Sequence, residues 1–214
     1  MCPQSLFKLR PAFDLVLRDI IQAFADRSHS ESSATSTGIK ASRKAYVVLI
    51  EGRRKRWTEE LWRRLEASVR MVPRTSAGAA FHSLLASADV LLHPFPFGGS
   101  KTAADGLSLG VPVVAMEGNT LAGRMAYSLY RTMGLDGPMN SGCCVARDRE
   151  GYVQLAVRLG RDARYRRWAG DLIDQRSEVL WDRREVVLEW ARFLARAGGH
   201  SNPTPEEVKR RKLT

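Results

Sequence analysis

Hydrophobic and polar positions follow two alternating patterns along the chain. Apolar side chains at positions 13, 16, 17, 20, 21 and 24 recur with helical spacing, which predicts a helix over residues 10–25. The run AYVVLI at 45–50 is continuously apolar, which predicts a strand buried on both faces. Shorter apolar runs predict further strands at 70–72, 88–94, 111–116 and 143–146. Helical patterns follow at 58–70, 78–87, 101–109, 121–135, 148–159, 162–176 and 183–197. Thr58 is the expected cap of the helix at 58–70, and Thr120 that of the helix at 121–135.

Strands that alternate with helices predict an open, mostly parallel sheet with helices on both faces. We therefore expect an α/β fold with a Rossmann-like, doubly wound parallel sheet. The chain has 214 residues, enough for one ordinary domain, which we place at residues 1–198. In such sheets ligands bind beyond the carboxyl ends of the strands, where the strand order reverses.

Two segments lie outside this pattern. Residues 26–44, DRSHSESSATSTGIKASRK, are rich in Ser and Thr and nearly free of apolar side chains, which predicts a flexible insertion inside the domain. Residues 199–214 are polar and basic, which predicts a disordered tail.

The composition narrows the kinds of partner. A formal net charge of +11 favours an acidic partner, such as nucleic acid, membrane headgroups or a phosphorylated small molecule. The basic residues are scattered and not interleaved with aromatic ones, so we interpret them as solvated helix faces and do not expect nucleic acid as a partner. The three cysteines match no zinc spacing, and we expect Cys143 and Cys144 in a buried strand.

The longest apolar runs are too short to span a bilayer, and the N-terminus lacks the apolar core of a signal peptide. We therefore expect an intracellular, cytoplasmic chain without a membrane partner. The run KRRK at 209–212 is a weak signal for the nucleus.

Candidate chemistry gathers in HPFPFGGSKTAADG at 93–106, between two predicted strands. Gly98 and Gly99 let the backbone approach a ligand closely. The helix that follows presents free N–H groups at its first turn, Thr102 adds a hydroxyl and Lys101 a charge, which together suit a diphosphate. Asp105 could accept hydrogen bonds from a ribose. Without further context a tight turn and a solvated Asp105 are the preferred explanation, because neither a Walker loop nor a GxGxxG motif is present.

The wider sequence resembles the C-terminal half of the glycosyltransferase family that includes O-GlcNAc transferase and the SPINDLY proteins. The matching pieces are QSLFKLRPAFD at 4–14, VLIEG at 48–52, ADVLLHPFPFGGSKTAADGLSLGVPVVAMEG at 88–118, LAGR at 121–124 and YVQLAVRLGRD at 152–162. They fall in family order and cover nearly the whole chain outside the insertion and the tail.

This resemblance implies the donor-binding half of a GT-B glycosyltransferase. The family transfers N-acetylglucosamine from UDP-GlcNAc to Ser or Thr of acceptor proteins, without a metal or other cofactor. It implies that Lys8 and Thr102 contact the donor diphosphate, and we expect Gly98, Gly99, Ser100 and Lys101 to complete the diphosphate site. It places Asp105 at the ribose, with Gln4 or Ser5 facing the donor. No catalytic residue is assigned by it.

Several positions depart from the family pattern. Ser100-Lys101-Thr102 replaces His-Thr-Thr, Phe81 stands where the family has a histidine, and His93 replaces an aspartate. His82 is expected to point away from Phe81 on the same helix. The acceptor-side half and the tetratricopeptide repeats of the family are not recognised in the sequence, so such a half or a repeat protein is an expected partner.

Two alternatives stay open at this point. SPINDLY-type relatives use GDP-fucose, and the segment PRTSAG at 73–78, where base selectivity arises, favours neither base. The chain could also be a non-catalytic binding module for a nucleotide or an acidic partner.

Overall fold

The computed structural model describes residues 1–30, 46–65, 69–75, 77–137 and 143–199. The chain divides into two compact units, Met1–Ser177 and Glu178–Thr214, and each is described by itself. Among the described residues, no helix is both long enough and apolar enough to cross a bilayer.

The first unit begins with the short helix η1 (Leu6–Lys8) and the long helix α1 (Pro11–Ser30). Strand β1 (Val47–Ile50), helix α2 (Lys55–Leu65) and strand β2 (Val69–Val72) follow. The two strands are parallel and in register from Val47 opposite Val69 to Ile50 opposite Val72.

The remainder of the first unit repeats the alternation of helix and strand. Its elements are α3 (Gly78–Ala86), β3 (Leu91–Leu92), α4 (Ser100–Leu107), β4 (Val113–Met116), α5 (Met125–Thr132), β5 (Val145–Ala146), α6 (Arg149–Arg161) and α7 (Ala163–Ser177). Strands β3, β4 and β5 form a second parallel sheet in that order.

The first residues of the chain connect the two sheets. The Cys2 N–H donates to the Val48 carbonyl at 2.9 Å, and the Leu92 N–H donates to the Met1 carbonyl at 2.7 Å. Residues 1–2 therefore take the place of a strand between β1 and β3. Counting this segment as the first strand gives the order 3-2-1-4-5-6, which is the strand order of dinucleotide-binding folds.

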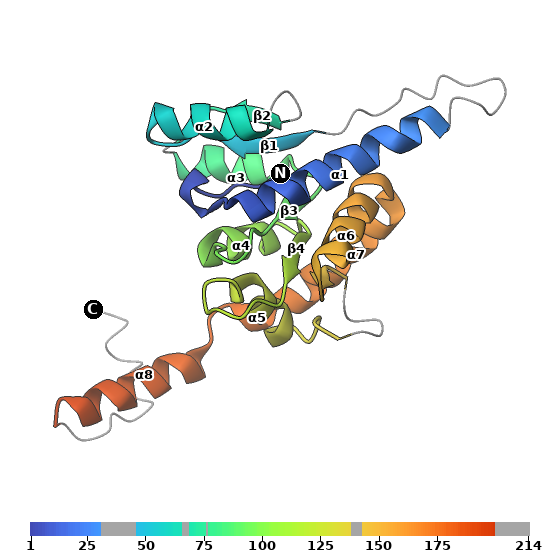
Figure 1. The fold of residues 1–214 in the computed structure, drawn as a ribbon. Helices are drawn as coiled ribbons and strands as arrows, with labels where there is room; N and C mark the ends of the chain where they lie inside the picture. Colours follow the sequence, from blue (N-terminus) through green and yellow to red (C-terminus); the bar gives the residue numbers. More distant parts are fainter. Residues whose placement is uncertain (31–45, 66–68, 76, 138–142, 200–214) are drawn as a thin grey trace. The chain divides into compact units, whose positions relative to one another are not determined.

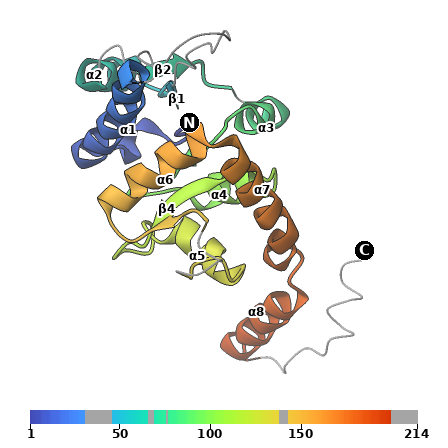
Figure 2. The same ribbon diagram turned by 90° about the vertical axis from the view of Figure 1, so that its right-hand side faces the viewer.

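Helices cover both faces of this arrangement, as predicted. Helix α1 contacts α2 and α6 on one face, while α4 contacts α3 and α5 on the other (Figure 1). Figure 2 shows α6 lying directly over β4. The α/β fold with parallel strands is confirmed, and Cys143 and Cys144 are fully buried next to β5, as expected.

An aromatic cluster under β3 fixes the position of the residues that leave this strand. Three rings contact one another edge to face: Phe13 on α1, Phe95 in the segment after β3, and Tyr152 on α6. The Tyr152 hydroxyl donates to the His93 carbonyl at 3.1 Å. The end of β3 is thereby tied to helices on the opposite side of the core.

Three local predictions were wrong. Helix α2 begins at Lys55, so Thr58 lies inside it and its hydroxyl accepts the Gly52 N–H at 3.0 Å. Thr120 caps a turn before α5, whose N-cap is Arg124, and accepts the Gly123 N–H. Strand β1 is buried only at alternate residues, because it belongs to the outer part of the sheet.

Helix α1 continues through Ser30, into the predicted insertion, and residues 31–45 lie outside the described residues. The second unit consists of η4 (Glu178–Leu180), α8 (Arg184–Ala197) and the residues around them, and none of its described residues is buried. The predicted domain boundary at 198 stays a prediction, and residues 200–214 of the predicted tail lie outside the described part.

Candidate functional site

Two segments leave the sheet side by side at the point where the strand order reverses. Residues 3–8 follow the N-terminal bridge, and residues 93–99 follow β3. Their carboxyl-end location is the position at which open α/β sheets bind ligands. Lys8 and the glycine loop before α4 therefore lie at the end of the sheet where the crevice is expected.

A cavity of about 300 Å³ opens between these segments. The predicted site residues Gln4, Ser5, Lys8 and Thr102 all line it. The ends of β1 and β2 complete the wall, with Glu51 and Arg74, and Phe81 comes from α3. Side chains that are far apart in sequence thus converge on one hollow of ligand size.

Lys8 is held at this cavity by two contacts. Its ammonium donates to the Gln4 side-chain oxygen at 3.0 Å and lies 5.3 Å from the centre of the Phe97 ring. Partial burial lowers the pKa of Lys8 below its ordinary value, and proximity to Cys2 works in the opposite direction. No carboxylate neutralises this ammonium among the described residues, so its charge is available to an anion.

Gly98 and Gly99 allow the loop to lie against two buried polar side chains. A Cβ added at Gly98 would stand 1.8 Å from the His93 ring, and one added at Gly99 would stand 2.3 Å from the Gln4 side-chain oxygen. Only glycine fits at these two positions without movement of the neighbours. The backbone at Gly98 and Gly99 therefore lies close to its neighbours, as a side chain at either position would not allow.

His93 is 2% exposed, and its Nε2 has no hydrogen-bond partner among the described residues. Burial, and to a smaller extent the nearby Lys8 charge, lower the pKa of this imidazole to about 4. The ring is consequently neutral at physiological pH. It acts as the inner support of the glycine loop.

Helix α4 starts at Ser100 with Gly99 as its N-cap, and no side chain caps it. Its first N–H groups are consequently free to bind an anion, and Thr102 brings a hydroxyl to the cavity wall. Lys101 and Asp105 instead pair with each other at 2.8 Å, and Asp105 also lies 3.7 Å from His82.

The predicted residues thus fall into two groups. Gln4, Ser5, Lys8 and Thr102 line the cavity, and Gly98 and Gly99 lie beside it through their contacts with His93 and Gln4. Ser100, Lys101 and Asp105 are not among the lining residues. The roles of all nine in donor binding stay predictions.

Glu51 and Arg74 were not predicted as site residues. Each comes directly or nearly directly after a predicted strand, at 45–50 and 70–72, and that position was the signal available in the sequence. Phe81 lines the cavity and His82 does not, in agreement with the expected direction of the two side chains. A carboxylate, a guanidinium and an aromatic ring supply the acceptor, donor and stacking surface that a base requires.

Within the described ranges, no group of three or more His, Cys, Asp or Glu side chains could hold a metal ion. That donor chemistry at this site needs no metal stays a prediction. Lys8, Arg53, Arg74 and the α4 N-terminus are positive groups that the chain itself supplies at this cavity.

The parallel sheet and the crevice at its reversal point are those of one half of a GT-B fold. The structure superposes on a mutant of the O-GlcNAc transferase of Thermobaculum terrenum with a TM-score of 0.67 at 23% identity, covering 85% of this chain and 32% of that one. Residues 85–187 match the model of glycosyl transferase family 41. This segment is similar to that family, and the resemblance to the O-GlcNAc transferase and SPINDLY family is confirmed.

Curated relatives give the same result. The chain is 38% identical over 74 residues to the probable UDP-N-acetylglucosamine–peptide N-acetylglucosaminyltransferase SPINDLY of Eustoma exaltatum subsp. russellianum, and 36% identical over 74 residues to that of Solanum lycopersicum. Each alignment covers 35% of this chain and 7% of the relative. The chain therefore matches a small part of these longer proteins.

Proposed function

We propose that this chain is the donor-binding half of a protein O-GlcNAc transferase. It binds UDP-GlcNAc, and N-acetylglucosamine passes to Ser or Thr of an acceptor protein when a facing half completes the cleft. One observation supports this most: Lys8, Gln4 and Thr102 converge on a cavity at the reversal point of the sheet.

The diphosphate of the donor lies between Lys8 and the start of α4. The free N–H groups of that helix and the Thr102 hydroxyl bind phosphate oxygens, while Lys8 offsets the charge that grows on the leaving diphosphate. Gln4 positions the lysine through their 3.0 Å hydrogen bond. The acceptor hydroxyl and its base are supplied by the facing half, which is the expected partner.

Titration calorimetry with UDP on the purified chain tests this proposal. A hydrogen bond to a charged group contributes about 1.5–3 kcal/mol, so Lys8→Ala should weaken UDP binding roughly tenfold or more. Thr102→Ala should weaken it about fivefold. Lys101→Ala is the matched control, because its ammonium already pairs with Asp105. Absence of binding heat at millimolar UDP would refute the proposal.

GDP-fucose is the alternative donor. Glu51 and Arg74 at the cavity offer an acceptor and a donor that guanine can use on two edges at once, whereas uracil presents a single N–H. Competition between UDP and GDP for the same site distinguishes the donors. Tighter binding of GDP than of UDP would assign the chain to the fucose-transferring type. The proposed location of the donor site would stay the same.

A further inference from the structure

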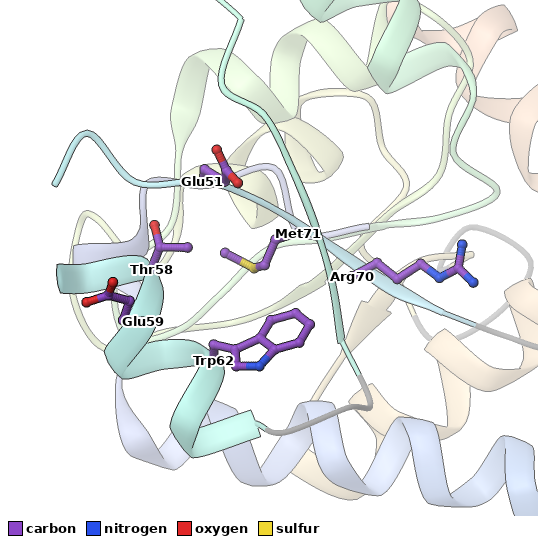
Figure 3. A pocket seen from close by; sticks show the side chains of 6 residues that line it. All are labelled: Glu51, Thr58, Glu59, Trp62, Arg70 and Met71. Carbon is purple, nitrogen blue, oxygen red and sulfur yellow. The ribbon is translucent and has the colours of Figure 1, made fainter. Parts of the chain in front are cut away.

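A second hollow, of about 590 Å³, lies between α2 and β2. Figure 3 shows its lining: Glu51, Thr58, Glu59, Trp62, Arg70 and Met71. Trp62 and Met71 form its apolar centre, and the side chains of Glu51, Thr58 and Glu59 lie along one side. The donor cavity shares only Glu51 with this set.

The hollow follows the open edge of the sheet. Arg70 and Met71 are consecutive in β2 and so point to opposite faces, yet both line it. Within the described part of the chain, β2 pairs with β1 alone. The Glu51 N–H donates to the Val72 carbonyl at 2.9 Å, so the backbone groups of Met71, one residue earlier, are directed to the unpaired edge.

The side chains around this edge suit a cation. Trp62 is 46% exposed, and an indole face is the best aromatic partner for a guanidinium or ammonium group. The Glu51 carboxylate has no hydrogen bond or ion pair with any described residue, and Glu59 has only the highly exposed Lys55, at 3.7 Å.

Several carboxylates of the first unit are instead paired with an arginine, as in Asp14 with Arg64 and Asp89 with Arg166. In a chain of net charge +11, the lining of this hollow places two carboxylates, Glu51 and Glu59, and one guanidinium, Arg70, around an exposed indole. Arg70 does not neutralise them, because its guanidinium stacks on the Tyr46 ring at 3.7 Å and extends away from Trp62 (Figure 3).

We propose that this hollow binds an extended basic peptide of a partner protein. The peptide backbone pairs with the open edge of β2 at Met71, and an arginine or lysine side chain lies over Trp62 toward Glu51 and Glu59. Because Glu51 borders both hollows, the bound peptide runs beside the donor cavity. Binding of the peptide here does not depend on the proposed function. The further step, in which the bound peptide serves as the acceptor of the sugar, does rest on the proposed function.

The test uses the full chain and the peptide acetyl-Val-Arg-Val-Ser-Val-Arg-amide. A second peptide carries citrulline in place of both arginines, which keeps the shape and removes the charge. Affinity is measured by fluorescence titration, and the Met71 amide and Trp62 indole signals are followed by NMR. We expect the arginine peptide to shift both signals and to bind at least about threefold more tightly than the citrulline peptide at low salt.

Variants assign the contacts. Trp62→Ala should weaken binding about fivefold and Glu59→Gln about twofold, because exposed charge pairs contribute little. Glu60→Gln is the matched control on the same helix, since Glu60 pairs with Arg63 at 2.9 Å and does not line the hollow. It should leave the affinity unchanged.

Equal affinity for the two peptides, no shift at Met71, or equal losses in Trp62→Ala and Glu60→Gln would each overturn the proposal. UDP titration of the same samples separates this result from the proposed function. Trp62 and Glu59 lie outside the donor cavity, so a chain that binds UDP but not the peptide retains its donor site and loses only this inference.

Discussion

The donor cavity and the hollow between α2 and β2 are built in opposite ways. The donor cavity rests on buried polar side chains, Gln4 and His93, which are 5% and 2% exposed. The other hollow is lined by exposed side chains, among them Trp62 at 46%. The donor cavity therefore joins an inner wall on the core to an exposed rim that includes Phe7 and Trp57, whereas the other hollow has no buried residue in its lining.

This difference determines whether a substitution changes the stability of the fold, the binding of a ligand, or both. In the donor cavity, the residues that shape the loop also carry packing, so changes there cost stability as well as binding. At the edge of β2, side chains can be removed at little cost to folding, because surface substitutions usually change stability by under about 0.5 kcal/mol. The predictions below test this division from the largest effect to the smallest.

Gly98→Ala should have the largest effect on folding. The new Cβ would meet the fully packed His93 ring at 1.8 Å, and overpacking of this kind costs about 3 kcal/mol. Urea denaturation measures the loss. Gly78→Ala is the control, because a Cβ there meets nothing within 4 Å. The double variant Gly98→Ala with His93→Ala should fall short of the sum of the two single losses, and strict additivity would contradict the contact.

His93→Asn should flatten the dependence of stability on pH. The folded pKa of about 4 lies below the ordinary value of 6.5, so the unfolded chain binds more protons between these values and stability falls as the pH falls. From pH 6.5 to pH 5 this amounts to about 1.5 kcal/mol in the parent chain. Denaturation at both pH values, compared between parent and variant, isolates the histidine. An unchanged difference would show that His93 is not buried as a neutral ring.

Gly99→Ala should act mainly on ligand binding. Its Cβ would displace the end of the Gln4 side chain, which is 2.3 Å away and holds Lys8. We expect about fivefold weaker binding of UDP, because Lys8 keeps its charge but loses the Gln4 hydrogen bond that positions it, with a smaller change in stability than for Gly98→Ala. Calorimetry and denaturation on the same sample compare the two. A larger loss of stability than in Gly98→Ala would reverse the assigned roles.

Trp62→Ala should have the smallest effect on folding, under about 0.5 kcal/mol, because the ring is half exposed and lies over an open edge. Urea denaturation measures it beside Leu61→Ala, whose side chain is 3% exposed and should cost about 2–5 kcal/mol. A comparable loss in the two variants would place Trp62 in the core.

Much of the fold could be predicted from the sequence, because the elements carry regular patterns. The helical spacing before residue 25 and the apolar runs at 45–50 and 111–116 correspond to α1, β1 and β4. Helix starts could not be placed as well. Thr58 has the chemistry of a cap, yet it bonds to Gly52 from within α2, and only the tertiary position of the preceding loop decides this.

The site was predictable where chemistry and strand ends coincide. Lys8, Gln4 and Thr102 do line one cavity, as the resemblance led us to expect, although nothing tests their roles. Lys101 and Asp105 lie four residues apart on a helix and pair with each other, a contact that their spacing allows but does not require. Glu51 and Arg74 belong to the wall through sheet topology, which no short motif encodes.

The central claim is that a nucleoside diphosphate binds at the loop between β3 and α4. NMR spectra of the ¹⁵N-labelled chain during titration with UDP test it most directly, since glycine amides are readily resolved. The account predicts that the Gly98, Gly99 and Thr102 amides shift on saturation, that Gly134 does not, and that Lys8→Ala raises the UDP concentration needed for half-maximal shifts roughly tenfold or more. Saturable binding with shifts elsewhere and none at Gly98 and Gly99, or no shifts at millimolar UDP, would contradict it.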